Sequence, residues 1–265
     1  MSRSNKWYGC IPDSQDSRDF MRSFSPAAAA KLPSIVSNMD LMPEIWNQGP
    51  AGTCGPHSFG GAFLADQKRQ GMVELFDKPS FNFMYWVTRK IMGTLGEDSG
   101  VQIRDLFKAA VKYGVCRDSD HPYDPKAIEV KPSRKAFVHA LNHQVLTYER
   151  IIDDSMKGDQ RIDAVRSALA KRLPVVFGFN VYRDFESEEM AKTGRGMKLP
   201  RMFAQILGGH AVLHEGYNDA KAEFHTRNSW DKNWGASGYF FMPYDCVADR
   251  KFSRDFWVVQ TVEAG

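Results

Sequence analysis

The sequence predicts an α+β protein in which a mainly helical lobe packs against a lobe of β-strands. Three observations support this fold class. The chain has 265 residues, 43% of them hydrophobic, which suffices for one large domain or two lobes. Apolar residues recur mainly at helical spacing before Pro174, and short β-branched or aromatic runs follow it. Because helices and strands are segregated along the chain, we expect α+β rather than alternating β/α units, with a ligand site between the lobes.

The first half of the chain predicts an extended arm followed by helices. Four prolines punctuate the first fifty residues, which favours an extended segment. Helical spacing of apolar residues then recurs in three segments and once more before Pro174. These segments run from near Cys54 to Gly71, from Ser80 to about Ile91, from just after Ser99 to Gly114, and from about Ile162 to Leu173.

The last ninety residues predict strands. Five short runs are rich in β-branched and aromatic residues and are separated by polar turns. These runs are VVFGFNV, AVLHEGYN, FHTRNSW, GYFFMPY and FWVVQTV. They give the second lobe its β character.

Composition excludes several classes of protein. Thirty-five Lys and Arg against 32 Asp and Glu give a net charge of +3, too balanced to indicate a nucleic-acid partner. No run approaches 18 apolar residues, and the N-terminus lacks the apolar core of a secretory signal, so we expect no membrane partner. The four cysteines form neither a CxxC pair nor a dense framework, so we expect no zinc ribbon, no cofactor and a reducing, cytoplasmic location.

A candidate nucleophile follows a glycine-rich turn in the segment NQGPAGTCG. Cys54 is expected at a helix N-terminus, where the positive end of the helix dipole lowers the pKa of a thiol. Gln48, six residues earlier, can bring an amide N–H beside the thiol and form an oxyanion hole with the Cys54 N–H. A free cysteine is also often a small buried core residue, which is the simpler interpretation of Cys54 taken alone.

A candidate base and its orienting partner lie downstream. His210, in LGGHAVL, follows two glycines into an apolar strand, and imidazole is the natural proton acceptor for a thiol. Asn228, in RNSW, can fix the orientation of a histidine ring, while Trp230 screens their bond from water. Each feature has a structural alternative: a satisfied core histidine, and an Asx turn held by tryptophans.

These segments together resemble the papain-like cysteine peptidases. NQGPAGTCG is similar to the family's Gln-Gly…Cys-Gly-Ser-Cys-Trp block, LGGHAVLHEGYN to its His-Ala strand, and RNSWDKNWGASGYF to its Asn-Ser-Trp…Trp-Gly…Gly-Tyr block. Weaker similarities include SGV at 99–101, YGV at 113–115, Pro122-Tyr123 and PVVFGF from Pro174. The resemblance covers about residues 32–262.

The resemblance implies a fold, a reaction and site residues. The fold is two-lobed, with the active site in the cleft between a helical lobe and an antiparallel, β-barrel-like lobe. The expected unit spans 1–265, with an arm at about 1–31, a mainly helical lobe at about 32–150 and a mainly β lobe at about 151–265. Cys54 is implied as nucleophile, His210 as base and acid, Asn228 as orienter and Gln48 as oxyanion donor. Ser99, Gly100, Gly209 and Trp230 are expected to contact a peptide or protein substrate.

The chain also departs from the family pattern. His210 and Asn228 lie 156 and 174 residues after Cys54, somewhat beyond the 130–150 typical of the family, and residues 186–200 are the candidate insertion. Ala51 replaces the family's disulfide cysteine, and Gly55 replaces its tryptophan. The N-terminal residues resemble those of the family's non-secreted bacterial or viral branch. This resemblance implies a location in the cytoplasm, including that of a viral host. We therefore expect control other than simple propeptide removal, and the length of the arm alone suggests that it lies near the cleft.

The expected reaction is peptide-bond hydrolysis through a Cys54 thioester. Two other functions use the same features. An acyl transferase or peptide ligase would pass the acyl group to an amine instead of water, and an inactive peptide-binding module would retain only the fold. His57 shares a helix face with Cys54, but a cysteine–histidine metal site lacks further ligands, so no metal is expected.

Overall fold

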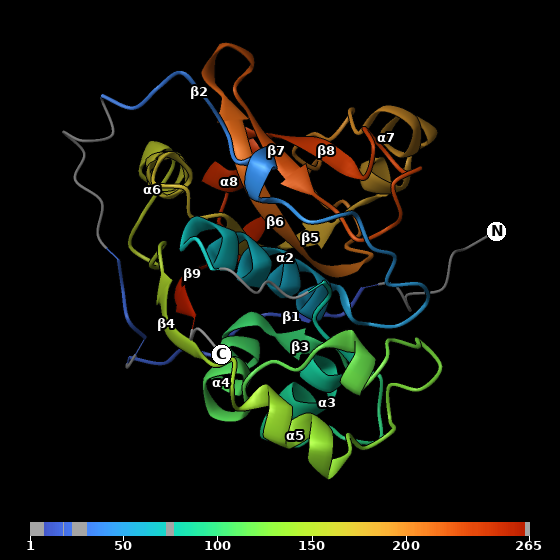
Figure 1. Ribbon diagram of the computed structural model, residues 1–265. Coiled ribbons are helices and arrows are strands. Elements are labelled where there is room, and N and C mark those ends of the chain that lie inside the picture. Colours follow the sequence, from blue (N-terminus) through green and yellow to red (C-terminus); the bar gives the residue numbers. More distant parts are fainter. Residues whose placement is uncertain (1–7, 18, 23–30, 73–76, 263–265) are drawn as a thin grey trace.

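The computed structural model describes residues 8–17, 19–22, 31–72 and 77–262. These residues form two lobes with the helix Cys54–Arg69 between them. The predicted two-lobed α+β fold is therefore confirmed. The lower lobe in Figure 1 contains the helices between residues 81 and 140, and the upper lobe contains most of a large sheet with the helices that follow residue 158. Among the described residues, no helix is both long enough and apolar enough to cross a membrane.

The helices follow the predicted segments closely. Their bounds are α2 Cys54–Arg69, α3 Phe81–Met92, α4 Ile103–Tyr113, α5 Arg134–Ala140, α6 Asp159–Ala170, α7 Glu188–Thr193 and α8 Tyr244–Ala248. Short 3-10 turns cover Met39–Leu41, Asp118–Asp120, Arg183–Glu186 and Asp219–Lys221. The hydroxyl of Ser80 accepts a hydrogen bond from the N–H of Phe83 and caps α3, which ends at a left-handed Gly93.

The large sheet has seven strands in the order β4-β9-β5-β6-β7-β8, with β2 paired to β6. Its strands are β2 Ile35–Ser37, β4 Val145–Arg150, β5 Val175–Val181, β6 Gly208–Asn218, β7 Glu223–Arg227, β8 Tyr239–Pro243 and β9 Ser253–Val262. All pairings in this sheet are antiparallel. Within the described part of the chain the sheet does not close, so the lobe is an open sheet rather than a barrel.

The sequence patterns missed two of these strands and one short pair. β2 and β4 come from the range 32–150 that was expected to be mainly helical, yet both join the large sheet. The helix expected just after Ser99 begins only at Ile103, because Val101–Gln102 form β3. β3 pairs in parallel with β1, Cys10–Ile11, which lies about ninety residues away in sequence. The candidate insertion at 186–200 contains α7.

Helix α2 lies at the centre of the molecule and sets the geometry between the lobes. Its residues from Cys54 to Gln67 are all buried. Two glycines allow this close packing: a Cβ on Gly60 would meet Phe81 of α3 at 2.8 Å, and one on Gly61 would meet Leu213 of β6 at 2.9 Å. The helix therefore packs against both lobes at once, and its N-terminus opens onto the boundary between them.

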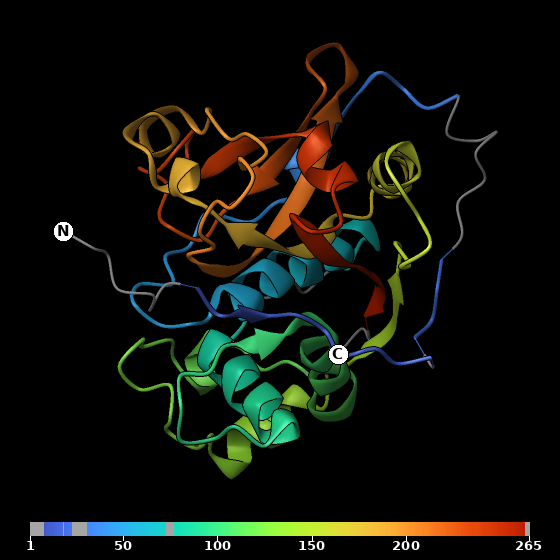
Figure 2. The same cartoon turned by 180° about the vertical axis from the view of Figure 1, so that it is seen from behind.

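Residues 8–13 run between the two lobes rather than away from them. In Figure 2 the dark blue segment containing β1 crosses the molecule between the upper and lower lobes, beside the start of α2. Gly9 and Cys10 are buried there. The expectation that the arm lies near the cleft is confirmed for this segment, whereas residues 1–7, 18 and 23–30 of the predicted arm lie outside the described residues.

Candidate active site

Cys54 is the first residue of α2, as the sequence predicts. Its sulfur accepts a hydrogen bond from the backbone N–H of Ala211 on β6, with 3.4 Å between Sγ and N. The side chain is fully buried. Burial raises the pKa of the Cys54 thiol, and the nearby N–H groups of Ala211 and Gly9 act in the opposite direction. In this arrangement the thiol is therefore shielded rather than activated.

The position after Cys54 explains one departure from the family. A Cβ on Gly55 would lie 2.7 Å from a methyl group of Val101. Any larger side chain would have to displace β3. The glycine is thus matched to the close approach of Val101, which itself packs against the arm.

His210 and Asn228 meet across adjacent strands. His210 lies on β6, and Asn228 follows the last residue of β7, so strand pairing brings the two together. The Nε2 atom of His210 lies 2.8 Å from the Oδ1 atom of Asn228. The same oxygen accepts the N–H of Ser229 at 2.8 Å, so Oδ1 is the acceptor and Nε2 carries the proton.

This bond fixes the protonation of the imidazole. With the proton on Nε2, the other nitrogen of a neutral ring, Nδ1, has a free lone pair. Among the described residues Nδ1 of His210 has no hydrogen-bond partner. Burial lowers the pKa of His210 to about 4, against the opposing effect of the bond to Asn228. The neutral ring can therefore act as a base. His210 directly precedes Ala211, whose N–H contacts the Cys54 sulfur.

Trp230 covers this pair. Its ring stacks on the imidazole of His210 with centroids 4.9 Å apart and planes 28° apart. The side chain of Trp230 is also packed against Phe185, at 5.2 Å between centroids. The indole therefore shields the His210–Asn228 bond from water, in addition to its predicted contact with substrate.

Gln48 is buried beside the turn that precedes Cys54. Its Nε2 donates to the carbonyl of Ala51 at 2.9 Å, and its Oε1 accepts the hydroxyl of Ser229 at 2.6 Å. These bonds tie the amide both to the nucleophile turn and to the loop that follows Asn228. Gln48 is thus bonded to the turn that leads into Cys54. Its role as an oxyanion donor stays a prediction.

Sequence patterns missed two supporting residues. The hydroxyl of Tyr123 donates to the carbonyl of Gln48 at 2.5 Å and lies 2.7 Å from the hydroxyl of Thr53. Ser229 holds the Gln48 amide as described above. Pro122-Tyr123 and the serine of RNSW were visible as parts of motifs, but their contacts arise only from the folded loops.

The expected substrate contacts are placed around residues 8–10. Ser99 is half-buried and donates to Thr94 at 2.9 Å, and the N–H of Gly100 donates to Tyr85 at 2.9 Å. Neither of these two residues bonds the segment at residues 8–10 through its N–H in the structure as described. The neighbouring Val101 does so, because its N–H donates to the carbonyl of Gly9 at 2.8 Å. On the opposite wall, a Cβ on Gly209 would lie 2.1 Å from the carbonyl oxygen of Cys10.

The arm covers both reacting groups. Tyr8 lies edge-on to His210 with centroids 6.0 Å apart, and a Cβ on Gly208 would meet Tyr8 at 2.6 Å. The backbone N–H of Gly9 faces the thiol of Cys54, and the side chain of Cys10 is buried, with 6% of the residue exposed. Cys54 and His210 have no exposed surface in this arrangement.

The other histidines near the site are structural. His57 stacks on Phe81 at 3.9 Å between centroids and shares a hydrogen bond of 2.8 Å with the carbonyl of Thr53. Burial lowers the pKa of His57 to about 3. His214 stacks on Phe177 at 4.0 Å. No group of three or more potential metal ligands occurs among the described residues, and the four cysteines, all described, are free.

Comparison with known proteins shows the family of the chain. Residues 92–252 match the papain family cysteine proteases. An uncharacterized peptidase C1-like protein of Acanthamoeba polyphaga mimivirus is 38% identical over 234 residues, covering 87% of this chain and 74% of the relative. Bovine pro-cathepsin H is 27% identical, over 77% of this chain and 56% of its own length.

Solved structures give the same result. Xylellain, a cysteine protease from Xylella fastidiosa, superposes with a TM-score of 0.86 at 34% identity, over 99% of both chains. Procathepsin B from Trypanosoma congolense superposes with a TM-score of 0.72 at 16% identity, over 98% of this chain and 88% of its own, which supports the fold. The chain therefore belongs to the papain family of cysteine proteases and is a peptidase of that family.

Proposed function

We propose that the protein hydrolyses peptide bonds through a thioester on Cys54, with His210, Asn228 and Gln48 in the roles that the sequence predicts. The observation that carries this assignment is the His210–Asn228 bond. Among the residues that the structure describes, this bond leaves Nδ1 of His210 as a buried nitrogen without a hydrogen-bond partner. The next residue, Ala211, donates its N–H to the Cys54 sulfur.

The reaction begins with proton transfer. Nδ1 of His210 takes the thiol proton of Cys54, and the resulting imidazolium stabilises the thiolate. The sulfur attacks the substrate carbonyl carbon and forms a tetrahedral adduct. The N–H of Cys54 at the start of α2, together with the Gln48 amide, stabilises the negative oxygen.

The adduct then collapses in two stages. His210 returns its proton to the leaving amine as the C–N bond breaks, which leaves an acyl thioester on Cys54. The neutral ring next takes a proton from water, the resulting hydroxide attacks the thioester, and the carboxylic acid leaves as the thiol is restored. Asn228 keeps the imidazole oriented through both stages.

A mechanism-based probe tests this assignment. We expect a peptidyl vinyl sulfone to label the protein at one site, Cys54, as shown by intact mass and peptide mapping. His210→Ala should abolish this labelling, since the thiol then lacks its base. Cys116→Ala removes a buried thiol outside the site and should label like the wild type. Labelling of His210→Ala at the wild-type rate would contradict the proposal.

Product analysis separates hydrolysis from transfer. With a peptide ester as substrate and an added amino-acid amide as acceptor, a hydrolase yields mainly the free acid. Predominant formation of the new amide bond at millimolar acceptor would overturn the assignment of hydrolysis while retaining the thioester.

A further inference from the structure

The side-chain amide of Asn228 is bonded by the protein through its oxygen only. Oδ1 accepts hydrogen bonds from Nε2 of His210 and from the N–H of Ser229, both at 2.8 Å. Nδ2 is buried and has no hydrogen-bond partner among the described residues. A buried N–H group without an acceptor is unfavourable in a folded protein, so Nδ2 requires an acceptor from outside the described chain.

A small cavity adjoins Asn228. Its volume is about 10 Å³, and its wall includes Trp46, His57 of α2 and Ala211 of β6. This volume is room for one water molecule and for nothing larger. Because Ala211 also donates its N–H to the sulfur of Cys54, the cavity lies directly against the reacting centre.

Two other residues of the cavity wall each carry a buried polar atom with no hydrogen-bond partner in the described part of the chain, Nε1 of Trp46 and Nε2 of His57. Nδ1 of His57 lies 2.8 Å from the carbonyl of Thr53, which can only accept, so Nδ1 carries the proton of the ring. Nε2 is therefore an acceptor, whereas the indole N–H is a donor. Both rings pack on Phe81, with centroids 3.9 Å away for His57 and 4.9 Å away for Trp46.

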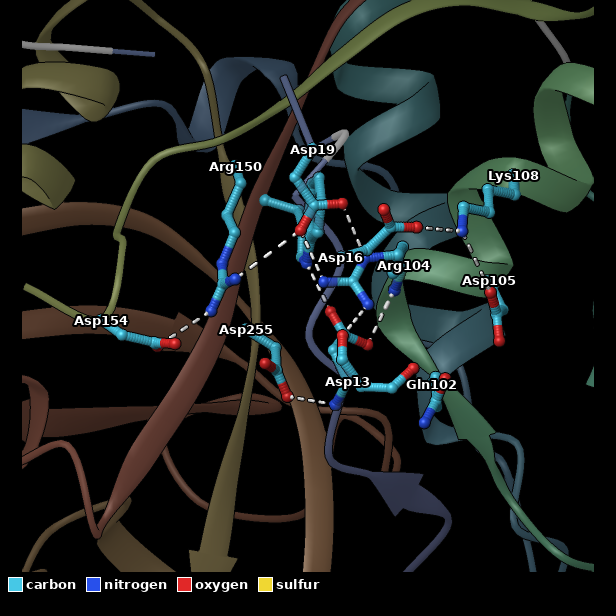
Figure 3. Close-up of polar contacts among 12 residues, drawn as sticks. Asp13, Asp16, Asp19, Gln102, Arg104, Asp105, Lys108, Arg150, Asp154 and Asp255 are labelled. Atoms are coloured by element: carbon cyan, nitrogen blue, oxygen red, sulfur yellow. Dashed lines mark hydrogen bonds and ion pairs between the residues drawn. The ribbon is translucent and has the colours of Figure 1, made fainter. Parts of the chain in front are cut away.

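Another buried tryptophan shows how the fold pairs an indole N–H within the protein. Trp257 donates to the carboxylate of Asp13 at 2.8 Å. Figure 3 shows the neighbouring contacts, in which Asp13 accepts the backbone N–H of Arg104 at 3.0 Å and Asp19 accepts its Nε–H at 2.7 Å. The indole of Trp46 has no such partner within the residues that the structure describes. It therefore depends on a ligand in the cavity.

The donors and acceptors of the cavity wall select the ligand. The two N–H donors, on Trp46 and Asn228, disfavour a metal ion, and the positive charge of Arg227 in the same wall does so too. The lone pair of His57 Nε2 disfavours an anion. Water has the required size, a lone pair for each N–H donor and an O–H for the imidazole.

We propose, resting on the proposed function, that one buried water molecule joins Asn228 to His57 and Trp46 and thereby positions the amide that orients His210. The Asn228 amide and the Trp46 indole donate to the water oxygen, and the water donates to Nε2 of His57. The amide is then held on both sides, by His210 and Ser229 at Oδ1 and by the water at Nδ2. His57 and Trp46 are positioning residues, since they act through Asn228.

The effect of this water falls on the catalytic step. It restrains the Asn228 amide to the place where Oδ1 meets Nε2 of His210. Without the water the amide moves more freely, and the imidazole is correctly oriented for less of the time. We therefore expect a change in kcat rather than in KM. Burial lowers the pKa of His57 to about 3, so its ring stays a neutral acceptor at the pH of the assays, pH 5 and above.

A high-resolution crystal structure of the full-length protein tests the water directly. We expect one peak of density within about 2.7–3.2 Å of Asn228 Nδ2, Trp46 Nε1 and His57 Nε2. In His57→Phe, whose ring can keep its place on Phe81, the occupancy of this peak should decrease. An empty cavity in the wild type, or density bonded to only one of the three atoms, would overturn the proposal.

Variants that keep each ring but remove its polar atom test the positioning role. We expect His57→Phe and Trp46→Phe each to lower kcat for a fluorogenic peptide by about 3- to 10-fold, with KM changed by less than about 2-fold. His57→Gln offers the water a carbonyl acceptor and should recover part of the loss. Unchanged kcat in both phenylalanine variants would overturn the positioning role.

His214→Phe is the matched control for His57→Phe. His214 is also a buried histidine, and it stacks on Phe177 at 4.0 Å between centroids, but it lies outside the cavity wall. We expect His214→Phe to change kcat by less than about 2-fold. An equal decrease in kcat for the two variants would overturn the proposal, since a general loss of packing would then explain both.

A double-mutant cycle separates this inference from the proposed function. In Asn228→Ala protein the amide is absent, so adding His57→Phe should change kcat by less than about 2-fold. Additive decreases would overturn the positioning role, because His57 would then act independently of Asn228. If Asn228→Ala itself leaves kcat unchanged, the role of Asn228 in the proposed function fails instead. Trp46→Phe completes the same cycle if His57→Phe does not fold.

Discussion

Replacement of Asn228 by alanine tests the hydrogen bond on which the catalytic assignment depends. The bond joins His210 and Asn228 at 2.8 Å, and both residues are buried under Trp230. Asn228→Ala leaves the Nε2–H of His210 without its acceptor, which costs about 1–3 kcal/mol. If this cost falls on the transition state, kcat/KM decreases roughly 5- to 150-fold.

Asn228→Ala should also lower the pKa of His210. The bond to Asn228 raises the pKa of His210 against the effect of burial. Its loss lowers that pKa further, so less imidazolium is available to protonate the leaving amine. We therefore expect the decrease to appear in kcat as well as in kcat/KM.

The assay separates catalysis from folding. kcat/KM for a fluorogenic peptide is measured for the wild type and for Asn228→Ala, with circular dichroism to compare the folded state. Asn233→Ala provides the control, because Asn233 is an exposed asparagine on the same loop whose side chain donates to the carboxylate of Asp231 at 2.7 Å. A decrease of less than 2-fold for Asn228→Ala, or an equal decrease for Asn233→Ala, would refute the orienting role.

Three further substitutions or treatments have defined outcomes. Trp230→Ala should lower kcat/KM by about 10-fold in the same assay, because the His210–Asn228 bond becomes exposed to water; unchanged kcat/KM would contradict the shielding role. His57→Ala should lower the free energy of unfolding by about 2–4 kcal/mol in thermal or urea melts, since a stacked, buried ring is lost, yet folded protein should still label at Cys54. Incubation with a chelator should leave kcat/KM unchanged, because the described residues offer no cluster of metal ligands; loss of activity restored by a divalent metal would contradict this.

The reacting residues could be predicted because each lies in a local pattern with a local cause. Cys54 begins α2 as expected from the Gly-Pro-rich turn before it, and His210 follows two glycines into β6. Asn228 was predicted to orient His210 from its side-chain chemistry and from the resemblance, and the pairing of β6 with β7 gives the physical reason why the two residues meet. The helix ends at Gly71 and Gly114 were predicted within a few residues for similar local reasons.

The pairing of the N-terminal segment and the edges of the sheet could not be predicted in this way. β1 and β3 have two residues each, which is too short for a periodic pattern, and they pair across ninety residues of sequence. β4 interrupts a segment with helical composition because its partner is β9, near the C-terminus. Such pairings depend on tertiary contacts, and no local sequence pattern encodes them.

Residues 8–10 can lie in the cleft only because the surfaces that they meet carry no side chains. A Cβ on Gly52 would meet the Cα of Gly9 at 3.4 Å, one on Gly100 would meet the carbonyl of Gly9 at 2.4 Å, and one on Gly209 would meet the carbonyl of Cys10 at 2.1 Å. Because real Cβ atoms do not approach backbone as closely as the last two distances, a side chain at Gly100 or Gly209 would displace this segment. The glycines that the sequence analysis assigned to substrate contact thus determine how closely any extended chain can approach Cys54.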